Sequence, residues 1–271
     1  MDFSVQKICD DVYSINDSGN SSFYVIIGTE KAAVIDTGIT KDARITPVIR
    51  SLTDKPLLLI ITHAHLDHLH HMDEFSEVYM SHRELKLSPA VLEAMACGKT
   101  LDYTATIDIK TDSLIEIGGN AIKICELPGH SPGGIMALDQ KHDLLFTGDC
   151  LGSGCGVWMQ VDTATSLDTF YDGLVQAFQW LVAHGGRMAF WGGHNMQVHM
   201  SLAVPKFNPL SLGLMADLID LVDQVRSGKL VGTPTDQGVM RPEEQVLYVA
   251  YGRAEMLYIA EDIHNDRYLR F

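Results

Sequence analysis

The stretch LLLIITHAHLDH, from Leu57 to His68, joins an apolar run to a dense cluster of candidate metal ligands. Its first half, Leu57–Thr62, is short, apolar and rich in branched side chains, which is typical of a buried β-strand. Three histidines and one aspartate follow directly, in the pattern HxHxDH, where the chain leaves the strand. Imidazole and carboxylate groups on a rigid scaffold are common ligands of divalent metals. The stretch therefore predicts a metal site at the end of a buried strand.

Three further candidate ligands stand beside glycines at the ends of other expected strands. They are His130 in LPGHSPGG, Asp149 in FTGD and His194 in WGGH. Glycine has no Cβ, so the backbone can come close to a compact centre at these positions. A single histidine after a strand is more often a surface or hydrogen-bonded residue than a ligand. Because all three share the setting of residues 63–68, the sequence favours one common metal centre.

Length and charge limit the classes of function. The 271 residues suffice for a sizeable core, and we expect one domain with insertions. The 35 acidic residues outnumber the 20 basic ones, which gives a formal charge of -15. This balance disfavours broad electrostatic attraction to nucleic acid or to an anionic membrane. We therefore expect a small-molecule substrate, with no nucleic-acid partner and no membrane partner.

The N-terminus and the cysteines point to a reducing compartment. Residues 1–7 lack the cationic and then apolar order of a signal peptide, and no apolar run is long enough to span a bilayer. The five cysteines are an odd number without CxxC spacing, so a disulfide framework is not expected. We expect buried, reduced thiols. The sequence thus predicts a cytoplasmic protein.

The first part of the chain predicts a run of strands followed by helix–strand units. Segments rich in β-branched residues predict strands at 12–15, 22–27 and 32–36. Apolar residues at helical spacing predict a helix over 43–52, which leads into the strand 57–62. We also expect a strand at 77–80, a helix at 88–96 begun by Pro89, and strand pairs 115–117 with 121–127 and 135–138 with 143–147.

The last part predicts two longer helices and a hairpin. Thr165-x-x-Asp168 has the pattern of a capping box, and an apolar face made by Leu167, Phe170, Leu174, Phe178 and Leu181 follows it, before Gly185-Gly186 ends the helix. A strand at 188–191, an irregular connection at Pro205 and Pro209, a helix at 210–225 and a hairpin of 246–251 with 254–259 complete the prediction.

This order of elements predicts two packed sheets with outer helices. We expect a single domain over residues 1–271, in which 206–271 form a C-terminal extension of one helix and one hairpin. The extension is the expected place for specificity. It can cap a pocket, form a homodimer contact, or pack on the chain's own sandwich, because an apolar helical face needs a partner.

At these residues the chain resembles the metallo-β-lactamase superfamily. That family carries HxHxDH, then a histidine in a GH[ST]PG turn, then an aspartate after glycine, then a late histidine, and all four occur here in order between 63 and 194. The segment VIDTG, residues 34–38, matches the strand and DTG turn that precede them. The resemblance implies an α+β fold, an αββα four-layer sandwich with its site at one edge, between the sheets.

The resemblance also implies a ligand set for two metal ions. His63, His65 and His130 would hold the first ion, Asp67, His68 and His194 the second, and Asp149 would bridge them. Two zinc ions per chain suit this mixture, and iron or manganese also fit the ligand types. Asp36 would orient a ligand from behind, although a turn residue at a strand end is an equal alternative.

The implied reaction is hydrolysis by a hydroxide that bridges the metals. Two nearby cations lower the pKa of a shared water to around neutrality, so no serine or cysteine nucleophile is needed. A proton held near Asp67, or the second metal, would stabilise the leaving group. Cys150 adjoins Asp149 but has no recognisable base, which favours a structural role.

Departures from the family pattern reduce the number of reactions that the resemblance allows. Many members have glycines after HxHxDH, whereas this chain has Leu69-His70-His71-Met72. We expect His70 and His71 at the surface, and the alternative is that they shape the pocket or bind substrate. His68 argues against a true β-lactamase, and His65 argues against oxygen-reducing di-iron members. The acidic charge argues against large RNA substrates.

The remaining hypothesis is a glyoxalase II-like hydrolase of a small thioester or ester, although no basic cluster for glutathione is recognisable. A lactonase or a phosphodiesterase of small molecules would use the same site. An iron-dependent oxidoreductase similar to persulfide dioxygenases is a second enzyme class. A non-catalytic ligand sensor that keeps the fold is a third hypothesis, because fold alone does not fix function.

Overall fold

The computed structural model describes residues 3–41, 43–153, 156–197 and 209–271. Within these ranges, the first sheet has seven strands, in the order β1 to β7. Neighbours are antiparallel as far as β4 and parallel from β4 to β7. The strands are β1 (Phe3–Cys9), β2 (Val12–Asp17), β3 (Ser22–Ile27), β4 (Ala32–Ile35), β5 (Leu57–Ile60), β6 (Val78–Met80) and β7 (Ile107–Asp108).

A second sheet packs face to face on the first. In the described part of the chain it has five strands, in the order β13-β11-β10-β9-β8. The core between the sheets is made by apolar residues such as Ile26, Leu58, Ile124 and Phe146, which alternate along their strands as a buried face requires. The strands are β8 (Leu114–Glu116), β9 (Ala121–Glu126), β10 (Ile135–Asp139), β11 (Leu144–Gly148) and β13 (Ala189–Gly192).

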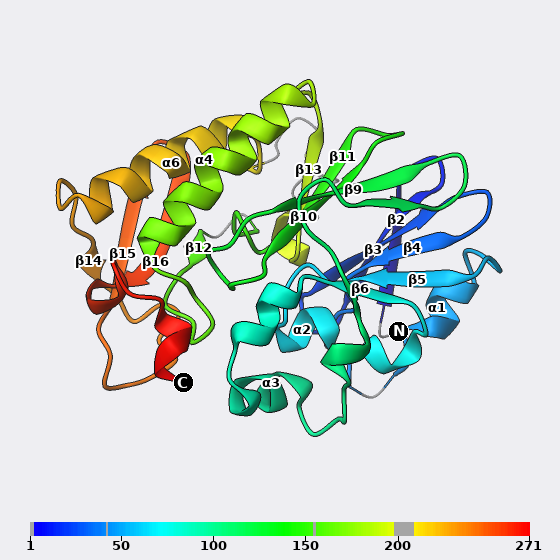
Figure 1. The fold of residues 1–271 in the computed structure, drawn as a ribbon, viewed down its shortest axis with the longest axis horizontal. Helices are drawn as coiled ribbons and strands as arrows, with labels where there is room; N and C mark the ends of the chain where they lie inside the picture. Colours follow the sequence, from blue (N-terminus) through cyan, green and yellow to red (C-terminus); the bar gives the residue numbers. More distant parts are fainter. Residues whose placement is uncertain (1–2, 42, 154–155, 198–208) are drawn as a thin grey trace.

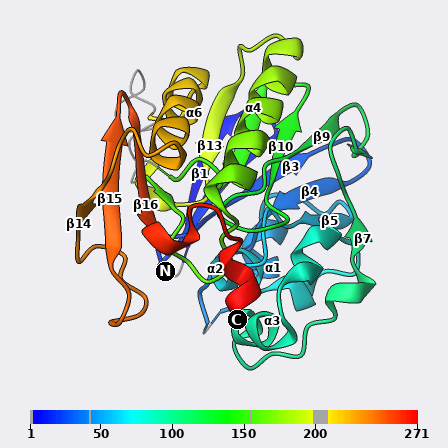
Figure 2. The ribbon, with the colours of Figure 1, turned by 60° about the vertical axis from the view of Figure 1, so that its left-hand side comes forward.

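Helices cover the outer faces of both sheets (Figures 1 and 2). Ile49 of α1 (Thr46–Arg50), Leu69 of α2 (Leu66–Leu69) and Val91 of α3 (Pro89–Ala96) pack against the first sheet. The apolar face of α4 (Leu167–Ala183), with Phe170 and Leu174, packs on the second. The four αββα layers expected from the resemblance are therefore confirmed. Short 3-10 helices lie at Met72–Glu74, His82–Lys86, Tyr103–Ala105, Ala260–Asp262 and Arg267–Arg270.

The C-terminal part builds a third sheet that the sequence did not predict. Among the described residues it has four strands, β12 (Val157–Trp158), β16 (Ala254–Ile259), β15 (Val246–Tyr251) and β14 (Thr233–Pro234), in that order. The predicted hairpin is its β15–β16 pair. Helix α6 (Leu212–Arg226) packs on α4 and on this sheet, and its apolar face is buried there. The chain's own elements thus cover that face.

Three further details of the sequence prediction were wrong or incomplete. The helix expected over 43–52 is only α1, because Pro47 occupies its first turn and the Glu74 carboxylate accepts the N–H groups of Ile45 and Thr46. The N-cap of α4 is Ser166, whose Oγ accepts the N–H of Thr169, so the capping box was one residue out of register. Strand β1 was missed because its residues are half polar and line an edge.

The connection predicted at Pro205 lies outside the described residues, as does Cys155. The four cysteines in the described ranges are free thiols; Cys125 and Cys150 are buried, whereas Cys97 is exposed and Cys9 is partly buried, so the prediction of burial was wrong for these two. No helix in those ranges combines the length and the apolar character that crossing a bilayer requires.

Candidate metal centre

The candidate ligands meet at one edge of the sandwich. His63 and His65 follow β5, His130 follows β9, Asp149 follows β11, and His194 follows β13. The two sheets are tied together at this edge, since Tyr24 Oη donates to Gly192 O at 2.5 Å and Ser22 N donates to Gly193 O at 2.9 Å. The site is therefore built on strand ends that the core holds rigidly.

All seven candidate residues come together in three overlapping groups. The groups are His63, His65 and His130; His63, His68 and Asp149; and Asp67, His68 and His194. Within each group one ligand atom per residue lies within 4.8 Å of the others. The first and third groups are the two ligand sets that the resemblance implies. The middle group shares His63 with the first group and His68 with the third, and it places Asp149 beside both.

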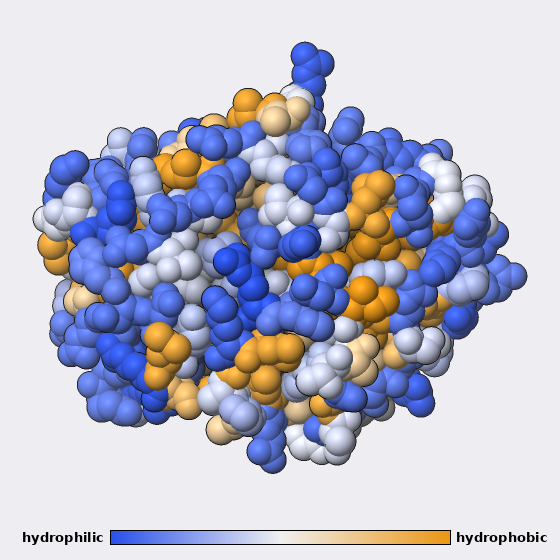
Figure 3. All heavy atoms as spheres, in the orientation of Figure 1, coloured by the Kyte–Doolittle hydropathy of each residue, from blue (hydrophilic) through white to orange (hydrophobic). Residues whose placement is uncertain are grey.

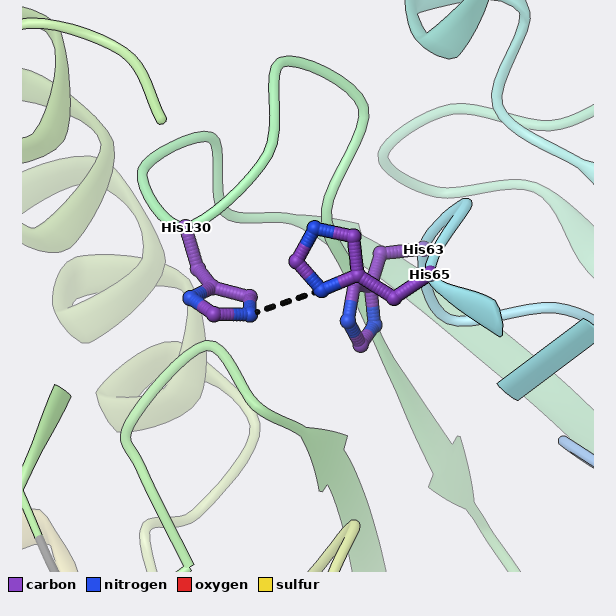
Figure 4. Close-up of side chains that lie close together, drawn as sticks. All are labelled: His63, His65 and His130. Atoms are coloured by element: carbon purple, nitrogen blue, oxygen red, sulfur yellow. Dashed lines mark hydrogen bonds between the residues drawn. The ribbon is translucent and has the colours of Figure 1, made fainter. Parts of the chain in front are cut away.

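His65 and His130 face each other with ring nitrogens that carry no proton. His130 Nδ1 lies 2.7 Å from Trp158 O, so it must carry the proton and donate it. Thr163 Oγ1 donates to His130 O and therefore accepts from His65 Nε2, 2.6 Å away. Burial lowers the pKa of both rings, that of His65 to about 3, so both are neutral. Two lone pairs thus meet across 3.0 Å, at the dashed line of Figure 4.

His63 and His68 are likewise oriented by hydrogen bonds at Asp36, but Asp67, Asp36 and Asp149 outweigh the effect of burial and raise the pKa of His68 well above its usual value. His68 Nδ1 lies 2.8 Å from Asp36 Oδ2, to which it donates. Thr62 Oγ1 also donates to Asp36 and therefore accepts from His63 Nδ1, 3.1 Å away. The Nε2 atoms of both rings are buried and have no hydrogen-bond partner. Asp36 therefore fixes both imidazoles from behind, the position expected for it.

The carboxylates supply negative charge at the centre. Burial favours the neutral acids, but His194 and His68 outweigh it and hold the pKa of Asp149 well below its usual range. His68 likewise keeps the pKa of Asp67 low, against the effect of burial. His194 Nε2 lies 2.9 Å from Asp149 Oδ2. Two ionised carboxylates beside unpaired nitrogen lone pairs fit a cationic centre, because buried polar atoms are otherwise almost always hydrogen-bonded.

Thr163, Trp158, Thr62 and Ser21 were missed at the sequence level. Each pairs with a candidate ligand through a hydroxyl or a backbone carbonyl, and Ser21 Oγ donates to Asp67 Oδ2 at 3.1 Å. Such partners orient ligands and tune their basicity. Hydroxyl residues and main-chain carbonyls occur everywhere in a sequence, so no local pattern marks them.

We expect Thr163→Val to weaken metal binding about 10- to 100-fold, because His65 loses the acceptor that fixes its tautomer. Competition with a chromophoric chelator measures this affinity. Thr163→Ser keeps the hydroxyl and serves as the matched control, with affinity close to that of the unsubstituted protein. Equal affinities for the valine and serine variants would contradict the assignment.

Glu84 ties the two histidine-bearing loops together. Its Oε1 accepts from Ser131 Oγ at 2.6 Å and from Gly133 N at 3.1 Å, and the carboxyl also accepts from the N–H of Ala64. The side chain is fully buried, and burial raises its pKa from 4.5 to about 7, against the lowering effect of these bonds. The folded chain therefore binds a proton at pH values where the unfolded chain has released it.

The folded protein should lose stability as the pH rises from 4.5 through about 7, since its Glu84 pKa lies above the unfolded value. The total loss from this group is at most about 3 kcal/mol. Urea unfolding of metal-free protein at about pH 5 and about pH 8 measures it. Glu84→Gln cannot titrate, so we expect a smaller loss in that variant. Identical pH profiles would contradict the raised pKa.

His70, His71 and Cys150 lie apart from the cavity at the centre. His70 and His71 are buried, which makes the surface prediction wrong; His71 Nδ1 lies 3.0 Å from Glu74 Oε1, and its backbone N–H donates to Thr37. Burial raises the pKa of Cys150 well above its usual value, and its thiol points to the carbonyls of Leu127 and Ile135. These contacts agree with a structural role for Cys150.

A cavity of about 930 Å³ opens from the centre. His65, Asp67, His130, Asp149 and His194 form its inner end. Its other walls come from segments far apart in the sequence, including α3, β12 and the loop before β15, which contributes Met240. The C-terminal extension therefore contributes Met240 to the cavity wall. A role at the pocket was one of the three that the sequence prediction left open for this extension.

Comparison with known proteins agrees with this geometry. The model of a family described as the metallo-beta-lactamase superfamily matches residues 16–180. The chain belongs to the metallo-beta-lactamase superfamily. Among solved structures of this fold, a metallo-beta-lactamase from Pontibacter korlensis superposes with a TM-score of 0.59, at 19% identity, over 82% of this chain and 99% of that one. At this identity the likeness shows the fold alone.

The curated relatives of this superfamily member are distant. The probable metallo-hydrolase YqgX of Bacillus subtilis is 29% identical over 140 residues, 48% of this chain and 66% of that protein. The acyl-coenzyme A thioesterase MBLAC2 of Bos taurus is 27% identical over 172 residues, 51% and 61% of the two chains. The hydroxyacylglutathione hydrolase of Bdellovibrio bacteriovorus is 31% identical over 137 residues, 47% of each. The matches thus span about half to two thirds of these relatives' lengths.

Proposed function

We propose that this chain is a dinuclear zinc hydrolase that cleaves a small thioester or ester. One observation carries the proposal: four imidazoles, those of His63, His68 and His130, which are buried, and of His65, which is partly buried, each direct one nitrogen to a protein acceptor and leave the other facing a common centre. Such an arrangement is costly without a cation, because the lone pairs of His65 and His130 face each other and the remaining ring nitrogens have no hydrogen-bond partner other than the centre.

The ligand assignment follows the three groups. His63, His65 and His130 would hold one zinc ion, Asp67, His68 and His194 the other, and Asp149 both. Asp36, Thr62 and Thr163 would orient ligands without touching metal. When bound, such a metal pair supplies a Lewis acid for the substrate carbonyl and makes water acidic enough to serve as the nucleophile near neutral pH.

Within this scheme a carboxylate of the chain, that of Asp67, transfers the protons of the reaction. Asp67 lines the cavity, and Ser21 Oγ holds its Oδ2 at 3.1 Å, so the carboxylate has a fixed orientation towards the substrate space. We propose that the Asp67 carboxylate accepts the proton released by the attacking water. It then donates this proton to the departing thiolate or alkoxide. The buried histidines, fixed by their acceptors, keep the reacting groups in place.

The relatives support a thioester more than the other substrates. Two of them are named as thioester-cleaving enzymes, the acyl-coenzyme A thioesterase and the hydroxyacylglutathione hydrolase. A third, BaeB of Bacillus velezensis, is named a probable zinc-dependent hydrolase of polyketide biosynthesis. Lactones and small phosphodiesters would use the same centre, and an iron-dependent oxidoreductase or a ligand sensor would keep the fold.

A combined metal and activity measurement tests the proposal. We expect about two zinc ions per chain in purified protein, and hydrolysis of a thioester that stops with a strong chelator and returns with zinc. Lactones and bis-arylphosphates are assayed as alternative substrates under the same conditions. Iron with oxygen uptake would favour the oxidoreductase, and a flat response with bound metal would favour the sensor. Well under one metal per chain, with no activity after zinc addition, would refute the proposal.

A further inference from the structure

The cavity beside the metal centre has a largely apolar outer part. Its walls there are built by six side chains from separate segments. They are Leu66, Met95, Trp158, Val161, Met196 and Met240. Methionine is flexible and polarisable, so three of them around one space suit an apolar ligand of variable shape. The total volume lies in the range of cavities that enclose a small organic molecule.

Two of these methionines are more than half exposed. Met196 and Met240 expose 54% and 59% of their surface, although they belong to a cavity wall. Figure 3 shows further apolar surface over the region of α3, the helix that carries Met95. Apolar side chains gathered at a cavity favour a ligand that removes them from water.

The charges of the described residues around this part of the cavity disfavour an anionic occupant. Among the described lining residues there is no lysine or arginine. Away from the metal centre the charged lining residue is Asp162, and two arginines already pair with it, Arg241 at 2.8 Å and Arg267 at 3.1 Å. A carboxylate or phosphate placed here would lose its hydration without gaining a cation.

We infer that this cavity binds an uncharged apolar acyl chain, whose carbonyl reaches the metal-ligand end while the chain lies against Met95, Trp158 and Met240. The inference rests on the proposed hydrolase function and specifies its substrate class. The leaving thiol then faces the solvent side. Chain length and chain charge, rather than the identity of the thiol, should determine the specificity of the enzyme.

A thioester series tests this directly. The zinc-loaded protein is assayed with N-acetylcysteamine thioesters from acetyl to decanoyl, and with acetyl thioesters of thiols of increasing length. We expect kcat/KM to rise about fourfold per acyl methylene until the cavity is filled, and to stay nearly constant along the thiol series. For thioesters with a terminal carboxylate on the acyl chain, kcat/KM should not rise as the chain becomes longer.

Substitution locates the effect in the cavity wall. Met240→Ala should lower the ratio of decanoyl to acetyl kcat/KM about tenfold. Val239→Ala is the matched control, because Val239 is 38% exposed on the same segment and lies outside the cavity lining. It should leave the ratio unchanged. A flat or falling acyl series, a rise along the thiol series, or equal effects of the two variants would overturn the inference.

A binding measurement separates this inference from the proposed function. Calorimetry with S-decyl-N-acetylcysteamine, a thioether that cannot be hydrolysed, needs no turnover. If no thioester is cleaved, the hydrolase proposal fails, but binding of the thioether that Met240→Ala weakens about tenfold would still establish an apolar-chain site. Absence of binding would overturn the inference even where a short thioester is hydrolysed.

Discussion

Asp149→Asn should abolish hydrolysis and lower the bound metal from two ions per chain to one or fewer. Asp149 lies in a group with His63 and His68, which belong to the two other groups, and we propose that it bridges the two ions. Asparagine keeps the size of the side chain but removes the negative charge that two cations would share. We expect kcat/KM to fall at least about a thousandfold, because no neighbouring side chain can supply the negative charge with which Asp149 would hold both metal ions.

The matched control for this variant is Ser153→Ala. Ser153 Oγ lies 3.4 Å from Asp149 Oδ1, so its loss should change activity less than about tenfold. Elemental analysis counts the metal, and circular dichroism checks that Asp149→Asn still folds. An Asp149→Asn protein with two ions and near-normal turnover would remove Asp149 from the centre and with it the bridge between the two groups.

Arg267→Met should cause the largest loss of stability among substitutions outside the metal centre. The Arg267 side chain is completely buried. Its guanidinium binds Glu244 and Asp262 at 2.9 Å and Asp162 at 3.1 Å. Methionine would leave these carboxylates together without their shared cation, which typically costs about 3–5 kcal/mol. For a chain of this size we expect the melting temperature to fall by about 10 °C.

Arg241→Met is the matched control for Arg267. Among the described residues Arg241 forms its ion pair with Asp162 and lies over the Phe271 ring at 4.1 Å, and its side chain is more than a third exposed, so its loss should cost much less stability than that of Arg267. Differential scanning calorimetry of both variants measures the contrast. Equal melting temperatures would show that the buried cluster does not hold the C-terminal part against Asp162 and the adjoining Thr163.

The metal-ligand candidates could be predicted because they repeat a dense local pattern. HxHxDH after an apolar run, and histidine or aspartate beside glycine at later strand ends, are visible in the sequence. The structure brings all seven residues together, as those patterns indicate. Most strands and the two longest helices were also predictable, since their apolar periodicity is strong.

What the sequence did not reveal depends on contacts between distant segments. Strand β12 has two residues and pairs with β16 almost a hundred positions later, so no periodicity marks β12 as a strand of the third sheet, although its β15–β16 hairpin was predicted. Thr163 matters only because that sheet brings it against His65. His70 and His71 looked like surface residues because their partners are not marked in the sequence: His71 contacts Thr37 and Glu74, and the His70 carbonyl accepts from Lys99.

The central claim is that two metal ions lie among these seven side chains. An anomalous difference map from crystals of zinc-loaded protein, recorded above the zinc absorption edge, tests it most directly. We predict two peaks, one surrounded by His63, His65 and His130 and the other by Asp67, His68 and His194, with Asp149 beside both. A map without peaks there, or with zinc held only by other residues, would contradict the account.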